Sequence, residues 1–111
     1  MLKHRRLSGP AWLGTTTTTL CTAAEGATLL VREMILHNSG AAPATYSLHL
    51  VPSGSAPGGD NRIFHGPLEP GETAMVSLGG SGLVLAEGDS LCALADTADS
   101  IVASIHGAEV S

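Results

Sequence analysis

The stretch from Thr28 to Pro52 constrains the fold most, because it holds two apolar runs with a turn-rich break between them. The runs are residues 29–36 and 46–51, and residues 38–43 between them are rich in turn formers. In the second run apolar and polar residues alternate, which is typical of a β-strand that buries one face. We interpret the two runs as an antiparallel pair of strands at the centre of a β-sandwich.

The first run changes parity in its middle. Its large apolar residues fall on two parities, Leu29 and Val31 on one, Met34 and Leu36 on the other. A β-bulge inserts one extra residue and so returns a strand's side chains to the same face. We therefore predict a bulge at Arg32 and Glu33 that places all four apolar side chains in one core.

The rest of the chain predicts further short strands, most of which follow a turn that contains Gly. The expected strands are residues 15–21, 62–65, 73–78, 83–85, 90–95 and 101–110. Residues 96–100 are predicted as a hairpin turn between the last two. With 43% hydrophobic but only 3% aromatic residues, the core must consist of aliphatic side chains. The prediction is an all-β, two-sheet antiparallel sandwich of about seven or eight strands, Ig-like or jelly-roll-like, over residues 15–111.

Residues 1–14 are predicted to form an extended N-terminal arm. Residues 3–6 are basic, and the Leu-Ser-Gly-Pro sequence of residues 7–10 is expected to interrupt any regular element. Trp12 then offers an apolar anchor. Two interpretations stay open: a frayed tail with Trp12 against the sandwich, or an arm that packs on a neighbouring subunit.

Charge and motifs favour an interaction module over an enzyme. The formal net charge is −5, which argues against direct nucleic-acid binding, and no apolar stretch is long enough to span a membrane. Cys21 and Cys92 are expected to be free thiols in a reducing compartment. No nucleophile motif, paired carboxylates or cofactor motif is found, so no catalytic residue and no cofactor is predicted.

The histidines raise one metal alternative. His37, His49 and His106 have outward parities in their predicted strands and could share one sheet face. None of them belongs to a spaced metal-binding motif, however. Hydrogen bonding at a surface or interface is therefore the favoured role, and no metal site is predicted.

Several segments carry a resemblance to a known group of proteins. They are LCTAAEGAT at 20–28, VREMILHNSG at 31–40, SLHLVPSG at 47–54, LEPGET at 68–73 and LAEGDS at 85–90. From about Thr15 to Val110 the chain resembles small virion-associated β-sandwich structural proteins of tailed bacteriophages. The resemblance implies a non-enzymatic capsid decoration (cement) protein on the virion, assembled in the host cytoplasm. The alternative is a head–tail, tail accessory or fibre-base protein, including a receptor- or glycan-binding module.

The resemblance also implies partners. These are the major capsid protein or neighbouring virion proteins, together with further copies of the chain in a trimer or dimer. Contacts are expected from the N-terminal arm and from the exposed loop 52–61. The residues named for them are Lys3, Arg5, Arg6 and Trp12 in the arm, and Asp60, Asn61 and Arg62 at the end of the loop. The glycan-binding alternative would use the second group, together with His65.

Overall fold

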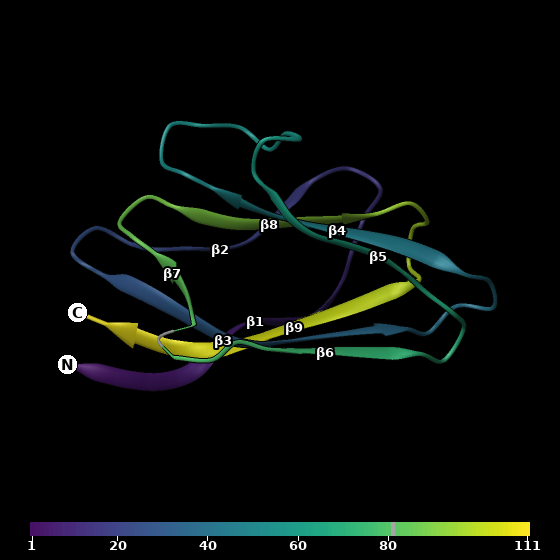
Figure 1. Ribbon diagram of the computed structural model, residues 1–111, viewed down its shortest axis with the longest axis horizontal. Helices are drawn as coiled ribbons and strands as arrows, with labels where there is room; N and C mark the ends of the chain where they lie inside the picture. The colour runs from purple at the N-terminus through teal and green to yellow at the C-terminus, as the bar shows by residue number, and fades with distance from the viewer. Residues whose placement is uncertain (81) are drawn as a thin grey trace.

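The computed structural model describes residues 1–80 and 82–111, which form nine strands in two stacked antiparallel sheets and no helix (Figure 1). Sheet A contains β1 (Leu2–Trp12), β9 (Ile101–Val110), β3 (Thr28–Asn38) and β6 (Thr73–Ser77) in this order, with β7 (Leu83–Leu85) beside the first part of β3. Sheet B contains β2 (Thr18–Thr22), β8 (Ser90–Ala95), β4 (Ala44–Val51) and β5 (Arg62–Leu68) in this order. The predicted two-sheet sandwich is confirmed. None of the described segments forms a helix that could cross a membrane.

The bulge in β3 is confirmed. The pairing of β3 with β9 shifts between Val31 and Glu33. On both sides of this shift the alternate apolar residues point inward, and each of the four is at most 2% exposed: Leu29, Val31, Met34 and Leu36. One extra residue thus lets an eleven-residue strand bury a single continuous face.

The predicted pairing of the two central strands is wrong. Strand β3 pairs with β6, β7 and β9 in sheet A, whereas β4 pairs with β5 and β8 in sheet B. The two strands are joined by a crossover between the sheets. The sequence pattern did not indicate this, because alternation shows that a strand buries one face but not which strand it pairs with. The link 96–100 is likewise a crossover, from β8 to β9, instead of the predicted hairpin turn.

Asn38 holds the first crossover in place. Its side chain is fully buried, and its Nδ2 donates hydrogen bonds of 2.9 Å to the carbonyls of both Ala42 and Leu68. Its Oδ1 accepts a third bond, of 2.9 Å, from the Gly40 amide. A buried amide with all these partners ties the end of β3 to the end of β5, and so fixes the two sheets to each other.

The N-terminal segment is extended, as predicted, but it is not a loose arm. Strand β1 pairs with β9 from Leu2 opposite Val110 to Trp12 opposite Val102. The expected interruption at residues 7–10 is absorbed by two shifts in this pairing, between residues 6 and 8 and between residues 8 and 11. Bulges of this kind let an edge strand accept Gly and Pro. The basic residues therefore lie on the edge strand of sheet A.

The core is aliphatic, as expected from the scarcity of aromatic residues. Its fully buried side chains are mainly Leu, Ile, Val, Met and Ala from both sheets. Tyr46 and Phe64 pack at its margin, whereas Trp12 is 51% exposed. The one tryptophan of the chain thus lies on the surface.

Candidate interaction surface

The predicted contact residues lie in two separate regions. Lys3, Arg5, Arg6 and Trp12 belong to β1 at the edge of sheet A, while Asp60, Asn61 and Arg62 lie beside sheet B, where β5 begins. The structure does not bring the two groups together. Each region must therefore be considered as a surface of its own.

Alternation along β1 divides its basic residues between two directions. Arg5 Nε donates to Glu109 Oε1 at 2.9 Å, in a partly exposed ion pair that contributes at most about 1 kcal/mol. Lys3 lies opposite Glu109, on the side of the sandwich interior. Arg6 lies opposite His106 and so points outward, as Trp12 does. Only Arg6 and Trp12 of the predicted group therefore lie on the outer face of sheet A.

A hollow lies between the two chain ends, next to Lys3. It is lined by Met1, Lys3, Glu109 and Ser111 and has a volume of about 190 Å³. Ligand sites are typically clefts of roughly 300–1,000 Å³ that enclose most of their ligand. This hollow is too small and too polar to be a good small-molecule site.

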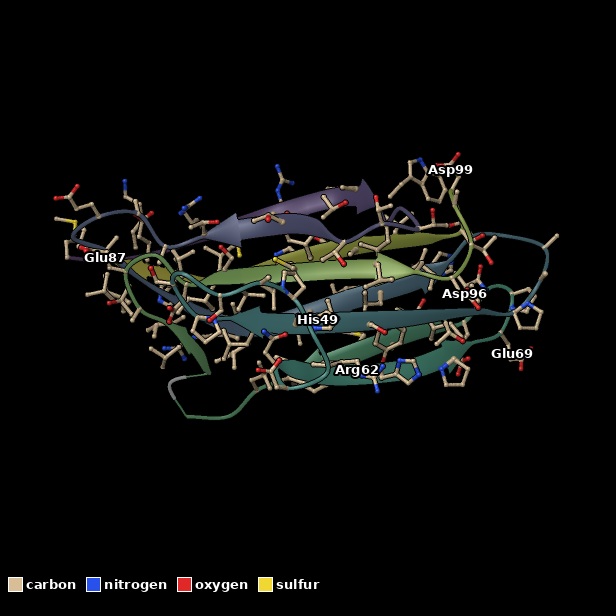
Figure 2. All side chains as sticks on the ribbon, turned by 90° about the horizontal axis from the view of Figure 1, so that it is seen from above. His49, Arg62, Glu69, Glu87, Asp96 and Asp99 are labelled. Carbon is tan, nitrogen blue, oxygen red and sulfur yellow. The ribbon has the colours of Figure 1, made fainter. Side chains whose placement is uncertain are left out.

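The loop 52–61 folds over the outer face of sheet B (Figures 1 and 2). Asn61 anchors it: its Oδ1 accepts from Gly58 N at 3.0 Å, and its Nδ2 donates to Ala56 O at 2.9 Å. The same Oδ1 lies 3.0 Å from His49 Nδ1. Gly58 O lies 3.1 Å from the same nitrogen. Because both of these oxygens are acceptors, Nδ1 of His49 carries the proton. Asn61 thus holds the loop, and Asp60 and Arg62 are the exposed members of this group.

The three outward histidines do not share one face. His37 and His106 lie in sheet A, whereas His49 lies in sheet B, so the suggestion of a common face is wrong. His37 bonds Thr73 Oγ1 and His106 bonds Ser104 Oγ, each at 2.8 Å. The described residues contain no group of three side chains placed to hold a metal ion.

Both cysteines are free thiols, as predicted. Burial raises the pKa of the Cys21 thiol to about 11, although a hydrogen bond with the Leu91 backbone and the charge of Arg5 act in the opposite direction. The thiolate is the nucleophilic form of cysteine. At neutral pH Cys21 is therefore protonated and poorly reactive.

One pair of side chains has the composition of a catalytic dyad. Ser47 Oγ lies 2.9 Å from His65 Nδ1, across the β4–β5 pair. Within the described residues, no carboxylate bonds to the His65 ring. Cross-strand hydrogen bonding accounts for this contact, because neighbouring polar side chains on a sheet face commonly stabilise each other.

The outer face of sheet A is the unusual surface of the molecule. Outward apolar side chains occur on every strand of the sheet: Leu2 and Trp12 on β1, Val102 and Val110 on β9, Leu30 and Ile35 on β3, Met75 on β6, and Val84 on β7. Met75 is 63% exposed. Large exposed apolar surfaces of soluble proteins mark interaction sites.

Of the apolar residues on this face, sequence reasoning identified only Trp12. A signal was present, because β3 is apolar on both parities, with Leu30 and Ile35 outward and its core residues inward. Such a run is typical of strands covered on both faces. The other outward apolar residues of β1 and β9 were missed because the pairing of these two strands was not expected.

Comparisons of the chain with protein-family models, with curated proteins and with solved structures found no match. The fold and the surfaces described above therefore carry the functional argument. The expected relationship to phage virion proteins stays a prediction.

Proposed function

We propose that the chain is a non-enzymatic structural protein that acts through contacts with other proteins, most specifically a decoration protein on the capsid of a tailed phage. The observation that carries the proposal is a small sandwich with two surfaces suited to contact with proteins: the exposed apolar outer face of sheet A and, separately, the basic end of β1. The resemblance of the turn and strand segments supports the narrower statement about phage capsids.

The proposed mechanism is an increase in contact area on the shell. Each copy would bury a modest surface against neighbouring capsid subunits, and repetition of the contact over a symmetric shell would raise the total stabilisation. The basic end of β1 offers a contact for an acidic shell surface, because Lys3 is exposed there and Arg5 and Arg6 lie next to it.

Particle occupancy tests the proposal. Purified chain is mixed with phage particles, the particles are sedimented, and the bound copies are counted. Many copies per particle are expected, and saturation at a few copies would favour the tail accessory alternative. No binding to any phage particle, or absence of the chain from purified particles, would refute the phage assignment.

A charge reversal tests the basic end of β1. Lys3→Glu should reduce occupancy, and Arg62→Glu serves as a matched control beside sheet B. Point substitutions are required because removal of residues 1–13 would delete the edge strand and expose β9. If Arg62→Glu reduces occupancy while Lys3→Glu does not, contact is made through the loop region instead.

A further inference from the structure

We propose that the outer face of sheet A is a dimer interface, occupied by a second copy of the chain. The two copies are related by a two-fold axis that lies between the faces, parallel to the strands, and midway between β9 and β3. The inference goes beyond the function proposed above, because it concerns the purified chain and does not require a phage particle.

Strand pairing divides the outer face into two halves of equal apolar content. One half, β1 with β9, carries Leu2, Trp12, Val102 and Val110. The other half, β3 with β6 and β7, carries Leu30, Ile35, Met75 and Val84. The boundary between the halves is the β9–β3 pair, which is the middle of the strand order.

The apolar residues also separate into the two ends of the face. Trp12 and Val102 are directly paired near the start of β9, and Ile35 and Met75 are paired in the adjacent row on β3 and β6. At the other end Leu2 pairs with Val110, and Leu30 pairs with Val84. Each end of the face thus has apolar residues in both halves.

A two-fold axis parallel to the strands exchanges the halves but keeps the ends. Trp12 and Val102 of one copy then lie over Thr73 and His37 of the other, one outward row from Met75 and Ile35, and the same contact occurs twice. Indole and thioether groups pack favourably. Each apolar end of the face in one copy therefore meets the same apolar end in the other copy, as an isologous contact requires.

Charge selects this axis from the alternatives. The middle row of the face runs from Arg6 through His106 and Glu33 to Ser77, with its basic groups on β1 and β9 and its carboxylate on β3. Exchange of the halves places His106 over the partner's Glu33, with Arg6 one strand further out, over Ser77. An axis perpendicular to the strands would instead place Arg6 over Arg6 and Glu33 over Glu33, which is repulsive.

Association through the edge strands is less favourable than association through the faces. Two β1 edges in antiparallel contact would bring the basic residues 3–6 of both copies together, and charged side chains on an edge strand oppose such pairing. The outer face, in contrast, carries opposite charges on the two halves of its middle row and apolar residues on either side.

The size of the face suits a stable contact. In Figure 1, which is viewed along the shortest axis of the molecule, the sheets are stacked in the plane of the picture, so the faces extend along the 42 Å and 20 Å axes. Their product, about 840 Å², is an upper bound for the outline of the face and is of the same order as the roughly 800 Å² that each partner buries in an interface of standard size. Sheets that pack face to face lie about 10 Å apart, which leaves room for these side chains to interdigitate.

Sedimentation equilibrium of the purified chain tests the proposal. We expect a mass twice the 11.2 kDa of one chain at about 100 µM. Met75→Lys should raise the dissociation constant at least about 30-fold, because it buries an unpaired charge in the interface. Ile63→Lys is the matched control, since Ile63 is also an exposed apolar strand residue, but on β5 of sheet B.

A charge exchange provides a test that does not depend on a single substitution. Arg6→Glu and Glu33→Arg should each weaken the dimer, and the double variant should restore it. A monomeric wild-type chain at this concentration would overturn the proposal, as would equal effects of Met75→Lys and Ile63→Lys. A dimer that persists in Lys3→Glu while particle binding is lost would separate this inference from the proposed function.

Discussion

At the scale of single residues, the burial of Cys21 links stability to pH. Its pKa in the folded chain is raised from 9.0 to about 11, because the thiolate would be desolvated between β2 and the core. Between pH 9 and 11 the folded chain therefore holds a proton that the unfolded chain has released. The free energy of unfolding must fall as pH rises through this window and is unaffected by this group below it.

Comparison of the wild type with Cys21→Ala isolates this effect. Urea unfolding at several pH values should show that the wild type loses about 2 kcal/mol relative to the variant between pH 8 and pH 11. Tyrosine and lysine titrations occur in both proteins and so cancel in the difference. A difference that stays constant with pH would show that the thiol is not desolvated in the folded chain.

Residue identity predicted some of these environments and not others. The free thiols followed from the compartment rule, and the inward face of β3 followed from its parity change. The burial of His49 did not follow, because its parity points outward and the loop 52–61, held by Asn61, folds back over it. Local alternation indicates which face a side chain occupies, whereas the path of the loop that covers this face is not recorded in the alternation.

At the scale of elements, the β3–β9 pair contains a close backbone approach next to the bulge. A Cβ added to Gly107 would lie 1.9 Å from the Leu30 carbonyl oxygen. Backbone atoms on both strands are held by ladder hydrogen bonds, so the contact can be relieved only by separating the strands. Gly107 is therefore required for the seam between the two halves of sheet A.

Gly107→Ala should lower the free energy of unfolding by about 1–3 kcal/mol or more, as overpacking typically does. Gly59→Ala is the matched control, because a Cβ there meets no atom within 4 Å and the residue has no positive φ. Thermal or urea unfolding of both variants measures the difference. Equal stabilities of the two variants would contradict the close approach.

The elements themselves were largely predictable, but their pairing was not. The strands 83–85, 90–95 and 101–110 have the expected bounds, since turn-forming residues mark where they begin. Strand β1 was missed as a strand because Gly9 and Pro10 lie within it, and only the shifted pairing with β9 reveals how they fit. Which strands become neighbours depends on long-range contacts that no local pattern records.

At the scale of the whole molecule, the two sheets differ in how their outer faces are covered. The loop 52–61 lies over sheet B, with Asn61 and His49 beneath it, and Figure 2 shows this loop beside His49. The outer face of sheet A keeps Trp12 and Met75 exposed. The chain itself therefore covers one face of the sandwich and leaves the other exposed. In the proposed dimer a second copy covers that face, and the basic end of β1 remains for the capsid.

The two chain ends lie side by side, because β1 and β9 are antiparallel neighbours. Strand β1 starts at the end of sheet A where β9 finishes (Figure 1). Ser111 N donates to Met1 O at 3.2 Å. Domains with adjacent ends commonly tolerate circular permutation if the new ends lie in an exposed loop. Joining the ends with a short Gly-Ser linker and opening the chain between Ser55 and Ala56 should therefore preserve the fold, because both residues are exposed.

This permutant should unfold cooperatively with a midpoint less than about 8 °C below that of the original chain, which corresponds to a loss of roughly 1 kcal/mol. It should also retain the dimer, because the new ends lie over sheet B and away from the outer face of sheet A. A control permutant opened between Glu33 and Met34 interrupts β3, the strand that pairs with three others, and should not fold. Thermal unfolding and sedimentation of both permutants measure these outcomes. Failure of the permutant opened at Ser55 to fold would mean that loop 52–61 contributes to stability as a continuous segment, beyond the contacts of Asn61.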